Sequence, residues 1–125
     1  MLMDTNDTTT ETSTCLQDIK KLLGPIPDEG FDDQICELMS LSLLQLSQVG
    51  CINSNVTAFT KDTKWGDIVK PPPNGDINTV TQAVKSVIYY NTKIAFDPPV
   101  STIVQAYRED INQMLWRIEV AYDDE

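Results

Sequence analysis

The sequence of 125 residues contains no histidine, so it lacks the side chain on which nucleophilic catalysis most often relies. Without histidine, neither a Ser-His nor a Cys-His nucleophile pair can form. The five glycines stand apart from one another, and none belongs to a glycine-rich phosphate-binding loop. These absences predict a protein that is not an enzyme and that needs no cofactor.

Cysteine is also scarce, with three residues at Cys15, Cys36 and Cys51. An odd, widely spaced set does not indicate a disulfide framework, and no histidine is present to complete a zinc site. The acidic residues Asp28, Glu29, Asp32 and Asp33 lack the alternating ligand spacing of a calcium loop, and the positive N-terminal end of the helix that starts near Asp32 explains them. We therefore expect no metal site, and we expect the thiols to be reduced and buried.

Basic residues are few: nine Lys and Arg stand against 19 Asp and Glu, which gives a formal net charge of −10. Such a surface repels the phosphates of DNA and of anionic membranes. The chain opens with no signal peptide, and no apolar run approaches the length that spans a bilayer. We expect a cytoplasmic, soluble protein, whose acidity serves either solubility alone or a specific function.

Apolar residues recur at helical spacing in four segments, which predicts helices over residues 14–23, 32–49, 78–96 and 101–122. The fold class is therefore mostly α, a small four-helix bundle. Residues 1–13 are polar and acidic and are expected to form a disordered tail, residues 14–122 the helical domain, and residues 123–125 an acidic end. The expected core includes Leu38, Leu46, Val84, Val87, Ile111 and Ile118.

Two of these helices carry wide apolar faces. In residues 32–49, Leu41, Leu43 and Leu44 broaden the main face, so we expect this helix to lie at the centre of the bundle. The last helix has a seam with alternating steps of four and three, widened by Ile103, Leu115 and Trp116. The seam consists of Val100, Val104, Tyr107, Ile111, Met114, Ile118 and Ala121.

The long connection over residues 51–77 is unusual for a compact domain and predicts a functional segment. Residues 56–60 and 65–69 have the composition of short strands that could pair as a hairpin. Phe59 and Trp65 are large apolar side chains, which we expect either to contact another subunit or to pack on their own core.

Charge suggests two further partner-facing regions. The helix over residues 78–96 carries Lys85 and Lys93 and no acid, which fits either an ordinary solvated face or a contact with an acidic partner. The chain ends in Tyr122, Asp123, Asp124 and Glu125, which we expect to meet a partner or to face a channel.

An ordered set of short motifs resembles the phage head–tail connector proteins, also called head-completion adaptors. The motifs span about Cys15 to Tyr122, whereas the Thr-rich tail before Thr14 looks longer than the usual start of that family. They are Asp18-Ile19-Lys20-Lys21-Leu22-Leu23-Gly24, Phe31-Asp32-Asp33-Gln34-Ile35, Val49-Gly50, Thr63-Lys64-Trp65-Gly66-Asp67-Ile68, Phe96-Asp97-Pro98-Pro99 and Leu115-Trp116-Arg117-Ile118.

This resemblance implies a helical subunit of a closed ring, dodecameric in the family, that lies beneath the portal protein in the virion neck. Duplex DNA would pass through the ring without sequence-specific binding, and a downstream neck or tail protein would dock on the other side. Assembly would take place in the host cytoplasm. The alternative is a small acidic helical module that inhibits or otherwise binds a basic partner.

Overall fold

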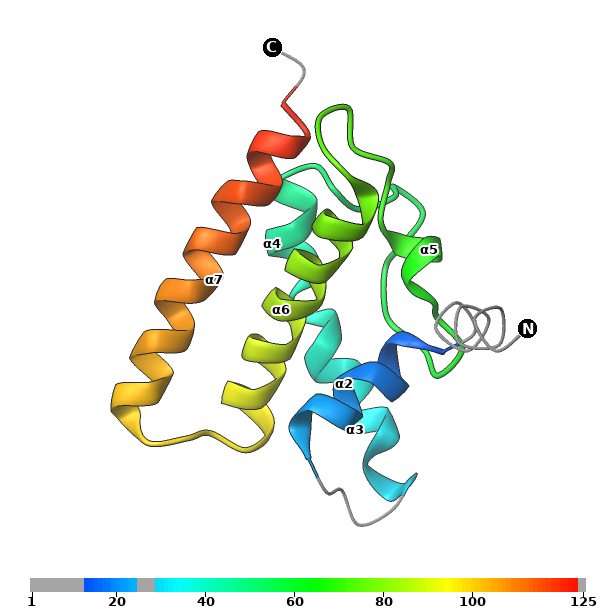
Figure 1. The fold of residues 1–125 in the computed structure, drawn as a ribbon. Helices are drawn as coiled ribbons and strands as arrows, with labels where there is room; N and C mark the ends of the chain where they lie inside the picture. Colours follow the sequence, from blue (N-terminus) through cyan, green and yellow to red (C-terminus); the bar gives the residue numbers. More distant parts are fainter. Residues whose placement is uncertain (1–12, 25–28, 124–125) are drawn as a thin grey trace, which may run out of the picture.

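The computed structural model describes residues 13–24 and 29–123. Within them the chain forms a layered helical unit, which confirms the mostly α fold class (Figure 1). Residues 1–12, which make up nearly all of the predicted tail, and Asp124 and Glu125 lie outside the described residues. The elements are α2 (Cys15–Leu23), the 3-10 turn η1 (Glu29–Phe31), α3 (Asp32–Ser40), α4 (Leu43–Gln48), α5 (Trp65–Ile68), α6 (Ile77–Phe96) and α7 (Ser101–Ala121).

The two longest helices, α6 and α7, form an antiparallel hairpin, and they share the most extensive contact in the molecule (Figure 1). Asp97-Pro98-Pro99 separates them because proline cannot continue a helix. Val84 and Val87 of α6 and Ile111 and Ile118 of α7 are buried, as predicted for the core. Val100, the first residue of the predicted seam, is instead 66% exposed. This pair is the frame on which the shorter helices pack.

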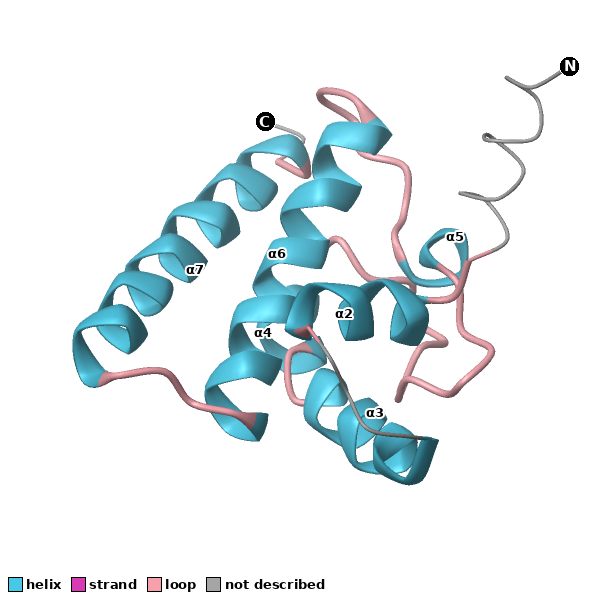
Figure 2. Cartoon of the chain, turned by 60° about the horizontal axis from the view of Figure 1, so that its bottom comes forward, coloured by secondary structure: helices cyan, strands magenta, loops and turns pink. Residues whose placement is uncertain are grey.

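The shorter helices α2 and α3 pack against α6, with α2 crossing it (Figure 2). Ile19 of α2 and Ile35 and Met39 of α3 are fully buried there. Helix α2 begins where Thr14 forms a reciprocal capping box with Gln17, which satisfies two amide groups of the first turn. The predicted start of this helix is therefore confirmed.

The helix predicted over residues 32–49 is interrupted at Leu41 and Ser42, so its continuity was predicted wrongly. The Ser40 hydroxyl donates to the carbonyl of Cys36 at 2.8 Å and accepts the amide of Phe59 at 2.9 Å. Two residues further along, the buried Ser42 hydroxyl accepts a hydrogen bond from the Asn91 side-chain amide at 3.0 Å. These side-chain bonds draw the chain out of regular helix and hold it to the middle segment and to α6.

The interruption also changes which leucines are buried. Leu41 and Leu44 are 67% and 69% exposed, so this segment is not buried on most sides as predicted. Leu38 is only half-buried, whereas the other five predicted core residues are buried. The break turns part of the wide apolar face outward.

The predicted hairpin is wrong: the described residues contain no strand, and only an isolated bridge joins Ile52 and Val69. Instead of a second strand, Trp65–Ile68 forms the short helix α5, because the Asp67 carboxylate accepts the amide of Lys64 at 3.0 Å and caps the turn. The segment is nevertheless well packed, since Phe59 and Ile68 are buried. The middle connection is part of the core of its own chain.

Candidate interaction surfaces

Trp65 joins the middle segment to α2 and α6. Its indole Nε1 donates to Asp18 at 2.7 Å, and the Lys85 ammonium lies 5.4 Å from the ring centroid. Lys85 also pairs with Asp18 at 3.5 Å, so these three side chains form one half-buried network. Phe59, 4% exposed, is buried in the same chain. Both aromatic residues thus pack within their own subunit. That they also contact another subunit remains a prediction.

Three of the four lysines within the described helices form ion pairs in the chain. Lys93 of α6 pairs with Asp97 at 2.9 Å, and Lys20 of α2 pairs with Asp32 at 2.7 Å. Together with the Lys85–Asp18 pair, these contacts leave Lys21 as the lysine of the described helices without an ion-pair partner among the described residues. The predicted role of Lys85 and Lys93 at a partner's acidic surface remains a prediction.

The end of α7 is tied to the segment before α6. The Tyr122 hydroxyl donates to the carbonyl of Lys70, and Asn74 donates its side-chain amide to the Asp123 carbonyl at 2.6 Å. Burial raises the pKa of the Tyr122 phenol to about 12. Of the four C-terminal residues that the sequence indicates, Tyr122 and Asp123 lie in the described part of the chain, where both are held in place and the Asp123 side chain is exposed.

Three tyrosines cluster where α6 and α7 approach the hairpin turn. The rings of Tyr90 and Tyr107 lie 4.6 Å apart, and Tyr89 lies 5.4 Å from Tyr90. Burial, together with a hydrogen bond that the Tyr89 hydroxyl donates to Tyr107, raises the pKa of Tyr89 to about 12. This packing fixes the geometry of the hairpin and offers no open site.

The outward side of α7 carries an exposed apolar pair that sequence analysis placed differently. Trp116 is 65% exposed and Val120 is 49% exposed, so Trp116 does not widen the buried seam as predicted. They lie one turn apart and, with Glu119, form a shallow surface next to Val49 and Gly50. Trp116 and Val120 are four residues apart, and each follows a seam residue, Met114 or Ile118, by two positions. This offset is the sequence signal that places them on the side of the helix opposite the seam.

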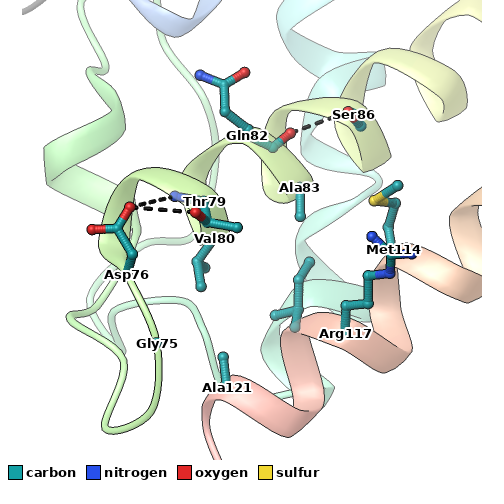
Figure 3. Close-up of a pocket in the computed structure, with 11 residues that line it drawn as sticks. Gly75, Asp76, Thr79, Val80, Gln82, Ala83, Ser86, Met114, Arg117 and Ala121 are labelled. Atoms are coloured by element: carbon teal, nitrogen blue, oxygen red, sulfur yellow. Dashed lines mark hydrogen bonds between the residues drawn. The ribbon is translucent and has the colours of Figure 1, made fainter.

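A groove runs along the other side of α7, between its C-terminal half and the N-terminal half of α6. Figure 3 shows Val80 and Ala83 of α6 facing Met114 and Arg117 of α7. The groove has a volume of about 310 Å³, and apolar side chains form most of its floor. Among the described residues, Arg117 at its rim has no ion-pair partner.

The described residues bring together no group of three or more metal-ligating side chains, and none of their helices is long and apolar enough to cross a membrane. The surface carries apolar residues on both sides of α7. Such exposed apolar surface is typical of a protein that works through contacts with other proteins.

Residues 15–125, nearly the whole chain, match the family described as phage connector protein. The chain therefore belongs to this family of phage head–tail connectors, which are structural proteins. No curated protein and no solved structure matches it.

Proposed function

We propose that this chain is a head–tail connector subunit that forms a closed ring beneath the portal protein in the virion neck. Duplex DNA passes through the ring without sequence-specific binding, and a downstream neck or tail protein docks on the opposite side. The chain acts without catalysis and without a cofactor. The observation that carries the proposal is the family match over residues 15–125, which agrees with the motifs in the sequence.

Charge supports the passage of DNA. A channel for a sliding duplex must not bind the phosphate backbone, and a basic lining would do so. The net charge is −10, and Lys20, Lys85 and Lys93 each pair with an aspartate of the same chain. A ring of such subunits can therefore present a lining with more Asp and Glu than Lys and Arg.

The C-terminal end is our candidate for the contact with the portal or with the channel. The Lys70 carbonyl holds Tyr122, and Asn74 holds the Asp123 carbonyl. The proposed contact involves Tyr122, Asp123 and the acidic residues Asp124 and Glu125 that follow in the sequence. The ring has twelve subunits if it follows the family pattern, and assembly takes place in the host cytoplasm.

The function is tested by stopping synthesis of this chain with a nonsense codon in the phage that encodes it. We expect DNA-filled heads and free tails that do not join, visible by electron microscopy of the lysate. Supplying the wild-type chain from a plasmid should restore joined particles and serves as the control. Normal tailed particles formed without the chain would contradict the proposal.

A further inference from the structure

We propose that the two apolar sides of α7 are the two halves of one head-to-tail contact between copies of this chain. The Trp116 side of one copy sits in the α6–α7 groove of the next, and Glu119 of the first copy pairs with Arg117 of the second. The inference deepens the proposed connector function and rests on it.

The groove can accept an apolar side chain from outside. Its floor is formed by Val80 and Ala83 of α6 and by Met114 and Ile118 of α7, and its volume is about 310 Å³. The side chains that line it come from both helices and leave the space between them open (Figure 3). Covering such a groove removes apolar surface from water and stabilises the contact.

The opposite side of α7 supplies a fitting side chain. Trp116 exposes 65% of its surface, and Val120 stands one turn further along the same side. Exposed tryptophans flanked by apolar neighbours are frequent anchors of protein interfaces, because the large ring buries much area with few rotatable bonds. Each copy of the chain carries both the groove and the exposed Trp116, so two copies can supply the two halves of one contact.

Charge complementarity selects the second copy as the occupant. Arg117 stands at the rim of the groove, and Glu119 stands beside Trp116; within the described part of the chain neither has an ion-pair partner. Two positions apart on a helix, they point in different directions and cannot pair with each other. Insertion of Trp116 into a neighbouring groove would bring the Glu119 of one copy toward the Arg117 of the next.

The placement of the two halves also suits a ring. Met114 and Ile118 line the groove, whereas Trp116 and Val120 are offset from them by two residues and therefore lie on the far side of the helix. A contact between unlike surfaces leaves each copy with one free half, so copies add in one direction and close when the rotation permits. A contact between like surfaces would stop at a dimer.

The contact is tested by cross-linking with a short bismaleimide, both in purified chain at high concentration and in phage particles. The probe is the double variant Ala83→Cys/Val120→Cys, with one cysteine on each half. We expect a ladder of covalent oligomers from the double variant and monomers from each single variant. The wild-type chain should stay unmodified, because Cys15, Cys36 and Cys51 are buried.

The charge pair is tested in the same cysteine background. Arg117→Glu and Glu119→Arg should each lower the cross-linked fraction roughly fivefold, and the double exchange should restore it. Glu37→Arg, an exposed residue of α3 with the same change of charge, is the matched control and should have no effect. Failure of the double exchange to restore the ladder would overturn the pairing.

Three results separate the contact from the proposed function. Particles that hold the chain but give no ladder from the double cysteine variant would overturn the contact and leave the connector role intact. Dimers from a single cysteine variant would overturn the head-to-tail arrangement, since like surfaces would then meet. Joined particles that lack the chain altogether would overturn the proposed function itself.

Discussion

The two tryptophans of this chain have opposite surroundings. Trp65 bonds Asp18 through its indole nitrogen and lies beneath the ammonium of Lys85, whereas Trp116 is mostly exposed on α7. The first contributes to the stability of the subunit, and the second is available for a partner. Substitutions at the two positions should therefore differ in their effect on the stability of the subunit.

Trp65→Ala should lower the free energy of unfolding by about 2 kcal/mol or more, because it removes packed apolar area and leaves Asp18 without its indole donor. Trp116→Ala is the matched control and should change it by less than about 0.5 kcal/mol. Urea unfolding followed by circular dichroism measures both. Equal losses from the two variants would contradict this assignment.

We also expect Trp65→Ala to weaken assembly, either through this loss of stability or through a contact of the middle segment with another subunit. Counting joined particles at a temperature where the variant is still folded separates the two causes. Reduced numbers at that temperature would support a contact of the middle segment with another subunit, and normal particle numbers would contradict that contact.

The raised pKa of Tyr122 predicts a loss of stability at high pH. Because burial raises the pKa to about 12 in the folded chain, from an ordinary value of about 10, the neutral phenol is favoured by folding. Its contribution is complete below about pH 10 and is lost as the pH rises toward 12. Tyr122→Phe should reduce the fall in unfolding free energy between pH 9 and pH 11, measured by urea unfolding.

Part of that fall should persist in Tyr122→Phe, because the pKa of Tyr89 is also raised to about 12. The buried Cys51 thiol also contributes to the loss of stability at high pH, since burial raises its pKa to about 12. Identical pH dependence in the wild type and in Tyr122→Phe would show that the phenol is not held as described.

Among the helices, the segment over residues 32–49 shows most clearly where sequence reasoning stops. Its apolar spacing is continuous, so the pattern predicts one helix. The break at Leu41 and Ser42 arises from partners far away in the sequence, Phe59 and Asn91, which bond Ser40 and Ser42. Bonds over such separations leave no periodic signal, whereas the capping residue Thr14 and the stop at Asp97-Pro98-Pro99 are local and could be predicted.

Asn91→Ala should destabilise the fold by about 1–3 kcal/mol, because its side-chain amide bonds both Ser42 at 3.0 Å and Gln45 at 2.8 Å and the buried Ser42 would lose its donor. Gln82→Ala, an exposed position of the same helix, is the control and should be nearly neutral. Thermal unfolding of the two variants gives the comparison. A neutral Asn91→Ala would mean that the break does not depend on this network.

The middle segment illustrates a second limit. Val56 to Thr60 and Trp65 to Val69 have the composition of strands, but a strand needs a partner along its length, and the described chain supplies only the Ile52–Val69 bridge. The cap from Asp67 then favours the short helix α5. The size of Phe59 and Trp65 predicts that both side chains make a packing contact. The sequence left open whether that contact lies in the chain's own core or with another subunit.

On the scale of the whole molecule, the sequence motifs and the family match agree on a phage connector, and the structure adds the arrangement of its surfaces. The seam of α7 predicted the buried side of that helix but not its outer side. An apolar residue outside a seam, such as Trp116, is indistinguishable in sequence from one that widens it, since the difference depends on which helices pack nearby. Surfaces between copies are the least predictable part, because they depend on more than one chain.

The central claim is the closed ring, and cryo-electron microscopy of the neck of the phage that encodes this chain tests it most directly. We expect identical copies in a closed ring beneath the portal, with a channel wide enough for duplex DNA and more Asp and Glu than Lys and Arg along it. A single isolated copy in the mature particle, or a channel lined by Lys20, Lys21, Lys85 and Lys93, would contradict the account.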